Sequence, residues 1–514
     1  MPYSMSPMTV TVGQPLGFED VVAVARGERA AIAPFVKDRV DAARSVVENA
    51  VDKNLTVYGI TTGVGELANV RIDPSAARRL QADLVRSHAT AVGPALPAEV
   101  VRAMLVLKAR TFAFGHSGVR FEILERLVEL LELRLHPVVP AQGSLGASGD
   151  LALLAHLALP LIGEGFVEHE GEVKDAAAAL KEAGLEPLEL SYKEGLSLVN
   201  GTEGMLALGI LAFDRAERLA RAADLIAAMT VEACYGTDRA FDSRIIGLRA
   251  HPGARLVASN LRKVLAGSEI VASHRNSDHL VQDAYSLRCT PQVHGAYRDG
   301  LEYVRRTLNA ELASAVDNPS VLPEDLDVRS SGNFHGEALG LALDHLCLLA
   351  AGYATISERR TARLVDPKLS NGLPAFLTEE PGKRSGFMIA HYTAASLASE
   401  NKSLCHPASS DSIPTSAGQE DHVSMGATSA RRALAVVSNS ENVLAIEALG
   451  AAQGLDFRDQ RLAPGTDAAR AAIREVSPHL TEDRPLSPDV GLVRELLTSG
   501  ALAAAVEKET GPLS

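Results

Sequence analysis

The spacing of apolar and polar residues along the chain predicts a mainly α-helical protein. Two stretches, Ala98–Gly115 and Phe121–Leu135, have the apolar period of a helix. Two longer stretches, Met205–Cys234 and Gly336–Leu364, have apolar residues over much of the helical circumference. Helices of that kind lie in the interior of a bundle. We therefore expect a large bundle of long helices.

Clusters of turn-forming residues divide this helical pattern. They are Asp317-Asn318-Pro319, Glu380-Pro381-Gly382 and a Ser- and Pro-rich run at 407–416. Helices end at such clusters, and the loops that they form can converge in space. The helical period dominates only beyond residue 60. We therefore expect the N-terminal portion to be a loop-rich α+β region that precedes the bundle.

One short run in the N-terminal portion can make an electrophile from the backbone. Residues 143–150 read Gly-Ser-Leu-Gly-Ala-Ser-Gly-Asp. Because Gly149 has no Cβ, its amide nitrogen can close on the carbonyl carbon of Ala147 with little steric resistance, which forms a five-membered ring. Loss of two water molecules, the second from the Ser148 hydroxyl, leaves an imidazolone with an exocyclic methylidene. The plainer interpretation of the same residues is a surface turn, which small residues and glycine also favour.

A second run, at 58–65, predicts a loop that carries a tyrosine. It reads Tyr-Gly-Ile-Thr-Thr-Gly-Val-Gly and follows a polar stretch. Glycine-rich loops place side chains on movable segments. A tyrosine phenol removes a proton from carbon only where positive charge or hydrogen-bond donors lower its pKa, which is normally about 10. Tyr58 is therefore a candidate base, and the alternative is a half-buried aromatic side chain with a satisfied hydroxyl.

Three other classes of protein fit these motifs poorly. Residues 63–68 match the dinucleotide fingerprint G-x-G-x-x-A, but Pro74 follows too soon for the helix that this fold requires. The nucleophile elbow of serine hydrolases, G-x-S-x-G, needs glycine where Asp150 stands. The histidines are scattered, and the sequence contains neither H-E-x-x-H nor C-x-x-C. We therefore expect no metal site.

Composition narrows the class of protein further. The chain has 514 residues, of which 46% are hydrophobic, and this suffices for a substantial core. A net charge of -14 argues against nucleic acid and acidic membranes as partners. The sequence lacks a signal-peptide pattern and a long uninterrupted apolar run, so we expect a cytoplasmic protein. The four cysteines lie far apart, and we expect free thiols.

Together these runs resemble those of the histidine and aromatic amino-acid ammonia-lyases. The Ala-Ser-Gly run and the tyrosine loop are the most specific motifs. Further similar segments are Leu198-Val199-Asn200-Gly201-Thr202, Gln282-Asp283-Ala284-Tyr285-Ser286-Leu287-Arg288, Ser331-Gly332-Asn333-Phe334-His335-Gly336 and the stretch from Ala398 to Met425. The resemblance extends from about Val24 to about Asp456.

The resemblance implies a prosthetic group, a domain division and an assembly. Ala147, Ser148 and Gly149 would form a 4-methylidene-imidazol-5-one, which takes up the amine of the substrate, and no external cofactor would be needed. Residues 1–200 would form the domain that carries this group and the Tyr58 loop. Residues 201–514 would form the central helical bundle and the C-terminal helices. The family also implies a homotetramer in which three chains contribute to each active site.

The resemblance also assigns residues around the substrate. Tyr285 would be catalytic, Asn200 and Gln282 would lie beside the substrate, and Phe334 would form an aromatic wall. If residues 282–288 were helical, Gln282, Tyr285 and Arg288 would share one face. The Arg288 guanidinium suits a substrate carboxylate because it donates two parallel hydrogen bonds. An interior salt bridge is the alternative role for this arginine.

Two positions bear on which amino acid is deaminated. His88 stands where phenylalanine-specific relatives usually have leucine, although tyrosine-specific relatives also carry histidine there, so this position alone does not decide the substrate. Glu420 stands where aromatic lyases and aminomutases commonly carry glutamine. A carboxylate can pair with an imidazole N–H, but it would be desolvated without compensation against a phenyl ring. We therefore expect non-oxidative deamination of L-histidine to trans-urocanate and ammonia.

Other members of the same family remain as alternatives. The run Thr61–Glu66 is closer to some tyrosine lyases and 2,3-aminomutases, and Gly418 stands where histidine-specific relatives usually have asparagine. A tyrosine or phenylalanine ammonia-lyase, or an aromatic 2,3-aminomutase with the same prosthetic group, is therefore the second hypothesis. A homologue with an inactive site is the non-enzymatic alternative, which the presence of Tyr58, Ser148 and Arg288 disfavours.

Overall fold

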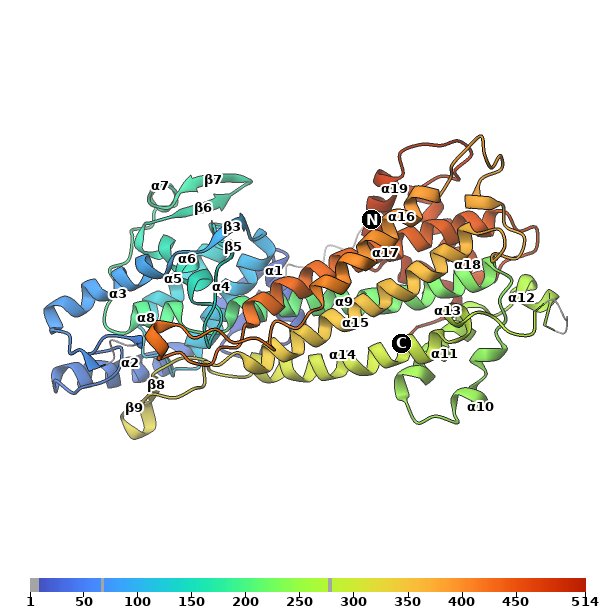
Figure 1. The fold of residues 1–514 in the computed structure, drawn as a ribbon. Coiled ribbons are helices and arrows are strands. Elements are labelled where there is room, and N and C mark those ends of the chain that lie inside the picture. Colours follow the sequence, from blue (N-terminus) through green and yellow to red (C-terminus); the bar gives the residue numbers. More distant parts are fainter. Residues whose placement is uncertain (1–8, 66–68, 276–279) are drawn as a thin grey trace. The chain divides into compact units, whose positions relative to one another are not determined.

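The computed structural model describes residues 9–65, 69–275 and 280–514, and it is mainly helical (Figure 1). This confirms the fold class that the sequence predicts. The backbone contacts divide the chain into two compact units. Unit 1 comprises Met1–Leu211, Arg306–Asp344 and Pro407–Arg431, and unit 2 comprises Ala212–Arg305, His345–His406 and Arg432–Ser514. The expected domain boundary near residue 200 lies close to the end of the first of these segments and stays a prediction.

Unit 1 contains eight helices and several small sheets among its described residues. The helices are α1 (Phe18–Ala25), α2 (Val36–Asp52), α3 (Pro74–His88), α4 (Ala98–Ala113), α5 (Phe121–Glu132), α6 (Leu151–Ala158), α7 (Ala176–Glu182) and α8 (Glu194–Val199). The strands are β1 (Thr9–Val12), β2 (Arg29–Ile32), β3 (Val92–Ala95), β4 (His136–Pro137), β5 (Pro140–Gln142), β6 (Phe166–His169), β7 (Glu172–Asp175), β8 (Ser320–Leu322) and β9 (Asp327–Arg329). β1 and β2 pair in parallel, and the pairs β3–β5, β4–β6–β7 and β8–β9 are antiparallel.

The division between the units falls inside four long helices. They are α9 (Glu203–Ala233), α14 (Thr290–Leu312), α15 (Glu337–Val365) and α17 (Gly426–Asp456). α9 and α15 match the two long apolar stretches of the sequence, and α4 and α5 match the two shorter ones. Two segments, Glu194–Ala233 and Glu337–Val365, are long and apolar enough to cross a membrane, but 100% and 67% of their most apolar windows are buried inside the protein. Such burial is typical of core helices.

Unit 2 contains the C-terminal parts of α9, α15 and α17, the N-terminal part of α14 and further helices. Its other helices are α10 (Ser243–Ile246), α11 (Pro252–Val264), α12 (Glu269–Ser273), α13 (Tyr285–Arg288), α16 (Met388–Leu404), α18 (Pro464–Val476), α19 (Ser487–Ser499) and α20 (Ala501–Thr510). A core cluster joins Ala354 of α15, Ala394 of α16 and Val443 of α17. The buried Arg360 and Glu447 form an ion pair between α15 and α17. The four cysteines are present as thiols and not as disulfides, as the sequence predicts.

The α4 helix forms the centre of unit 1. All of its residues from Val100 to Ala113 are buried, and these include three basic side chains, Arg102, Lys108 and Arg110. Arg102 donates hydrogen bonds to the carbonyl oxygens of Val24 and Leu131. A buried cation is tolerated only when it is paired or hydrogen-bonded. α4 therefore combines an apolar core surface with polar anchors for the surrounding segments.

The α8 helix lies unusually close to α3. A Cβ built on Gly195 of α8 would lie 2.2 Å from the carbonyl oxygen of Gln81 on α3. The side-chain oxygen of Gln81 also accepts a hydrogen bond from the Leu196 N–H at 3.1 Å. Only glycine at position 195 allows this backbone contact. The position of α8 within unit 1 therefore depends on Gly195.

We expect Gly195→Ala to lower the melting temperature, because the added methyl group meets backbone that no side-chain rotation can move. Overpacking of this kind costs about 1–3 kcal/mol. The matched control is Gly491→Ala in α19, where a Cβ would have no atom within 4 Å. This control should be neutral or stabilise by up to about 1 kcal/mol, because alanine favours helix more than glycine does. Equal melting temperatures for the two variants would refute the close packing of α3 and α8.

Candidate active site

A cavity of about 620 Å³ in unit 1 collects most of the residues that the sequence predicts for the site. Segments far apart in the sequence line it, including the Tyr58 loop, the end of α8 and the loops at 330–335 and 416–422. The predicted site residues among the lining residues are Tyr58, His88, Ala147, Ser148, Asn200, Phe334 and Glu420. Gly149 follows Ser148 directly. Two of the three predicted breaks, at 317–319 and 407–416, therefore converge here through Asn318 and Ser416, whereas residues 380–382 belong to unit 2.

The Ala-Ser-Gly triplet lies in a tight backbone turn. Gly149 has φ +88°, a conformation that favours glycine, and a Cβ there would lie 2.3 Å from the Met205 methyl carbon Cε. The Gly336 N–H donates a hydrogen bond to the carbonyl oxygen of Ala147 at 2.9 Å. Ser148 is 2% exposed. The turn thus holds Ala147 and Gly149 in a conformation that leaves no room for a larger residue at 149.

Asp150 ties this turn to the helices beside it. It is the N-cap residue of α6, which begins at Leu151. Its Oδ2 accepts a hydrogen bond from the Met205 N–H near the start of α9 at 2.9 Å. Asp150 is fully buried, and burial raises the pKa of its carboxyl group well above the usual value. The triplet is therefore followed by a carboxyl group whose neutral form is favoured.

The Tyr58 loop packs against α8. Gly59 has φ +64°, and a Cβ on it would lie 2.3 Å from Leu196 Cδ2. The Gly65 N–H donates a hydrogen bond to the Tyr58 hydroxyl oxygen at 3.1 Å. A donor at this oxygen stabilises negative charge on it. The loop thus brings a phenol with a backbone donor into the cavity.

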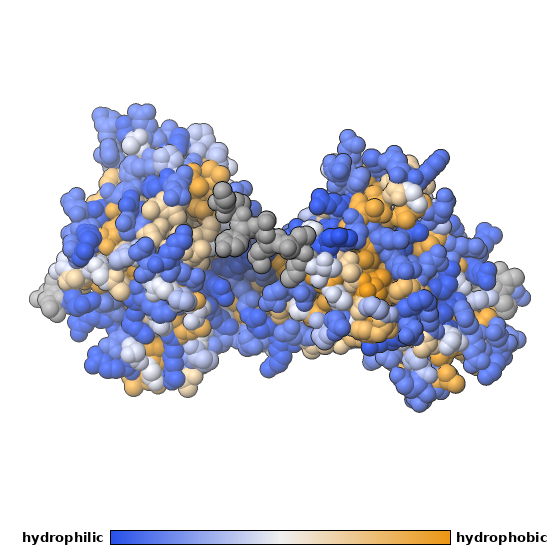
Figure 2. Space-filling model, turned by 180° about the vertical axis from the view of Figure 1, so that it is seen from behind, coloured by the Kyte–Doolittle hydropathy of each residue, from blue (hydrophilic) through white to orange (hydrophobic). Residues whose placement is uncertain are grey.

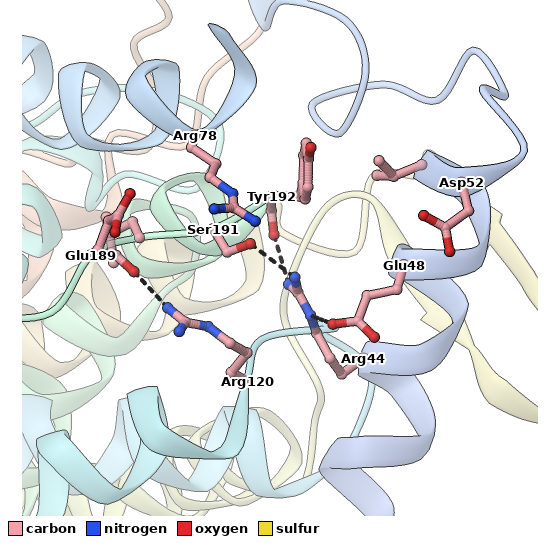
Figure 3. Close-up of a pocket in the computed structure, with 10 residues that line it drawn as sticks. Arg44, Glu48, Asp52, Arg78, Arg120, Glu189, Ser191 and Tyr192 are labelled. Carbon is pink, nitrogen blue, oxygen red and sulfur yellow. Dashed lines mark hydrogen bonds and ion pairs between the residues drawn. The ribbon is translucent and has the colours of Figure 1, made fainter. Parts of the chain in front are cut away.

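A neighbouring network of arginines and carboxylates anchors the other end of α8. Figure 3 shows a second cavity, of about 450 Å³, with Arg44 and Arg120 reaching toward the loop before this helix. The buried Glu194, the first residue of α8, accepts a hydrogen bond from Arg120 Nε at 2.8 Å and from the Ser191 N–H at 2.6 Å. Arg44 donates to Ser191 Oγ and to the Tyr192 carbonyl oxygen. These bonds fix α8, whose other end carries Asn200.

Glu420 and His88 bring two hydrogen-bond acceptors to the cavity. Glu420 lies in a tight turn in which Thr415 Oγ1 donates to Glu420 Oε2 at 3.3 Å. The same oxygen lies 3.6 Å from a Cβ built on Gly146, which places it beside the triplet. His88 Nδ1 lies 2.8 Å from the Leu84 carbonyl oxygen, which keeps the proton on Nδ1 and leaves Nε2 as an acceptor. Gly418 has φ +91°, which suits glycine in this turn.

Comparison with known proteins identifies the family to which this chain belongs. The family of aromatic amino acid lyases matches residues 16–475 of the chain. The chain belongs to this family. The lyase is 53% identical to the histidine ammonia-lyase of Deinococcus radiodurans over 488 residues, which cover 95% of this chain and 93% of that protein. The family that the sequence motifs predict is therefore confirmed.

Two solved structures are similar to the lyase over nearly its whole length. The histidine ammonia-lyase from Trypanosoma cruzi has a TM-score of 0.90 and 43% identity, and the match covers 98% of this chain and 96% of that one. The tyrosine aminomutase from Streptomyces globisporus has a TM-score of 0.93 and 38% identity, and the match covers 99% and 100%. Backbone similarity alone therefore does not distinguish histidine ammonia-lyases from tyrosine aminomutases.

Three predicted site residues of the lyase lie in unit 2 and not among the lining residues of this cavity. Gln282, Tyr285 and Arg288 line another cavity, of about 510 Å³. The Arg288 guanidinium lies 4.8 Å from the centre of the Tyr285 ring, and its Nε donates to the Asp283 carbonyl oxygen. The expectation of one shared helical face was wrong for Gln282, because α13 begins only at Tyr285. Tyr285 is 72% exposed.

One cluster among the described residues has the composition of a metal site. Donor atoms of His335, Glu337 and His422 lie within 4.8 Å of one another. The two imidazole rings are stacked, with 12° between their planes and 5.9 Å between their centres. The Glu337 N–H also donates to His335 Nδ1. This geometry fits ring stacking at the edge of the cavity better than metal ligation.

Sequence motifs did not reveal the charged residues that surround Asn200. Lys108, Lys193, Glu203 and Asp317 are all buried beside it. Asp317 belongs to the Asp-Asn-Pro cluster, which the sequence analysis treated only as a break between helices. Isolated charges within apolar stretches carry no periodic signal, so their pairing could not be predicted. The one available signal was that Lys108 interrupts the apolar surface of α4.

Proposed function

We propose that the protein is a histidine ammonia-lyase, which deaminates L-histidine to trans-urocanate and ammonia without oxidation. The observation that carries this proposal is that Glu420 and His88 line the same cavity as Tyr58 and Ser148. Both groups can accept a hydrogen bond from an imidazole N–H, which a phenyl ring lacks. The names of the relatives in Deinococcus radiodurans and Trypanosoma cruzi support the same substrate.

The proposed prosthetic group is a methylidene-imidazolone formed from Ala147, Ser148 and Gly149. The residues fit its formation, because ring closure puts negative charge on the Ala147 carbonyl oxygen, and the Gly336 N–H donates to this atom at 2.9 Å. Gly149 lacks the Cβ that would meet Met205. Once formed, the group supplies the electrophile that makes the substrate amine a leaving group.

The chain's own residues supply the remaining steps. In this proposal Tyr58 removes the β-proton of the substrate, and the Gly65 N–H stabilises the phenolate form of its hydroxyl oxygen. Phe334 forms an apolar wall of the cavity. Glu420 and His88 hold the imidazole ring, which fixes the Cβ atom of the substrate relative to Tyr58. Asn200 lies beside the reacting amine.

We also propose that each active site is completed by other copies of the chain in a homotetramer. Gln282, Tyr285 and Arg288 are the remaining predicted site residues, and Tyr285 is 72% exposed. A partner copy would supply Arg288 for the substrate carboxylate, to which guanidinium can donate two hydrogen bonds. Figure 2 shows hydrophobic residues between hydrophilic ones on the surface, and Leu348, Ile389 and Tyr392 are each more than half exposed. We propose a cytoplasmic location for the assembly.

The second candidate is an aromatic 2,3-aminomutase, which returns the amine to the β-carbon. The specific observation in its favour is the similarity to the tyrosine aminomutase structure, together with the Thr61–Glu66 run after the catalytic loop tyrosine. The carboxylate at 420 argues against it, because the family resemblance places a glutamine at this position in aromatic lyases and aminomutases. Product analysis separates the two functions.

Formation of the prosthetic group can be tested apart from the substrate. We expect the intact protein to weigh two water molecules less than its sequence requires. Ser148→Ala should restore the full sequence mass and abolish most activity, because no methylidene can form without the serine hydroxyl. Mass spectrometry of the peptide that contains Ala147–Gly149 makes the measurement. An active protein with an unmodified triplet would exclude the electrophile.

Specificity for histidine can be tested at Glu420. Glu420→Gln keeps the size of the side chain and its hydrogen bond with Thr415 but removes the charge. A charge-assisted hydrogen bond contributes about 1.5–3 kcal/mol, so kcat/KM for L-histidine should fall by about one to two decades. Turnover of L-tyrosine or L-phenylalanine should fall less or rise.

The control for this test is Asp421→Asn, which removes the neighbouring carboxylate that also lines the cavity. It should change kcat/KM for L-histidine by less than about threefold, since the electrostatic effect of an exposed carboxylate with no ion-pair partner among the described residues is small. Equal losses on all three amino acids in Glu420→Gln, with a lowered melting temperature, would show instead that Glu420 only stabilises its loop.

A further inference from the structure

The structure holds the Asn200 carboxamide in one of its two possible orientations. Asn200 ends α8, lines the cavity and is 7% exposed. Its Nδ2 donates to the Asn318 carbonyl oxygen at 3.2 Å and to Asp317 Oδ1 at 3.4 Å. Both partners are acceptors, so the nitrogen end of the amide must face them. The oxygen end, Oδ1, is then the end that remains for the cavity.

Asp317 forms a buried ion pair with Lys193. Asp317 is 3% exposed, and its Oδ2 accepts from Lys193 Nζ at 2.8 Å. Its Oδ1 accepts from the Asn318 N–H at 2.7 Å as well as from Asn200. Lys193 is fully buried and also donates to Ser197 Oγ at 2.9 Å. Burial lowers the pKa of Lys193, and the charge of Asp317 opposes this shift.

A second buried pair holds the backbone of the same asparagine. Lys108 Nζ donates to the Asn200 carbonyl oxygen at 2.7 Å and lies 3.4 Å from the carboxylate of the buried Glu203. The backbone of Asn200 is therefore fixed independently of its side chain. The freedom that remains is a flip of the carboxamide, which exchanges an acceptor for a donor at the cavity. The two acceptors of the Asn200 Nδ2 hydrogen bonds, in Asp317 and Asn318, oppose this flip.

We propose that Lys193 and Asp317 are positioning residues that keep the Asn200 carboxamide oxygen directed at the substrate. This inference rests on the proposed function, in which Asn200 lies beside the reacting amine. The oxygen accepts a hydrogen bond from an amino N–H, whereas a flipped amide would present two N–H donors to it. The buried ion pair thus affects the reaction by determining whether the oxygen or the nitrogen of the Asn200 amide faces the substrate. Neither Lys193 nor Asp317 lines the cavity.

The test compares two double variants that differ in whether residue 317 offers a hydrogen-bond acceptor to Asn200. Lys193→Met/Asp317→Asn removes both charges but keeps an amide oxygen that can accept from Asn200. Lys193→Met/Asp317→Leu removes both charges and the acceptor. Neither leaves a buried charge without its partner, which would itself be strongly destabilising. If the leucine variant does not fold, Lys193→Met/Asp317→Ala takes its place because it adds no bulk.

We expect kcat to be at least tenfold lower in the leucine variant than in the asparagine variant, with a smaller change in KM. Both should lose two water molecules in mass and melt at similar temperatures. When Asn200→Ala is added to each, the difference in kcat should vanish, because the effect passes through Asn200. A purely structural role would leave that difference in place.

Two results would overturn the inference. One is equal kcat for the two double variants when Asn200 is present, and the other is an undiminished difference in the Asn200→Ala background. The assays use whichever of L-histidine, L-tyrosine and L-phenylalanine the wild-type protein deaminates. A wild-type protein that deaminates only an aromatic amino acid would refute the proposed substrate, and the comparison of variants would still decide the role of Asp317.

Discussion

The close approach of backbone segments around Met205 is the constraint on which the rest of the site depends. Cβ atoms built on Gly149, Gly336 and Gly426 would each lie within 3.0 Å of the Met205 thioether. These glycines belong to the triplet turn and to the starts of α15 and α17, so their lack of side chains lets three distant segments meet. The same approach brings the Gly336 N–H to the Ala147 carbonyl oxygen. A side chain at 149 would also have to adopt a φ of +88°, and a Cβ at 336 would lie 3.0 Å from the Ser148 carbonyl oxygen, which rotation of Met205 cannot relieve.

Buried charge is the second element of this arrangement. Lys108, Lys193, Glu203 and Asp317 surround Asn200, and Glu194 anchors the helix that leads to it. Buried ion pairs stabilise a fold weakly, because desolvation offsets much of the attraction. They do impose strict geometry, since each group must find its partner. We infer that this network of buried charges fixes the orientation of the polar groups at the cavity.

The sequence predicts the helices and the chemical motifs well, but not how they meet. α9 and α15 follow from apolar residues around the whole helical circumference, and Tyr58 and Ser148 follow from motifs whose chemistry is specific. No local sequence pattern predicts that residues 306–344 and 407–431 belong to unit 1, because this depends on packing between segments far apart in the sequence. The sequence did not predict that α13 begins only at Tyr285, because the spacing of three residues between Gln282 and Tyr285 also fits a helix. The pairing of Lys193 with Asp317 spans 124 residues and leaves no periodic trace.

The most direct measurement for the central claim is the identity of the product. The purified protein is incubated separately with L-histidine, L-tyrosine and L-phenylalanine, without added metal, pyridoxal phosphate or nucleotide. The products are followed by absorbance and identified by chromatography that also resolves β-amino acids. The account predicts trans-urocanate and ammonia from L-histidine as the dominant reaction. Coumarate, cinnamate or a β-amino acid as the main product would contradict it.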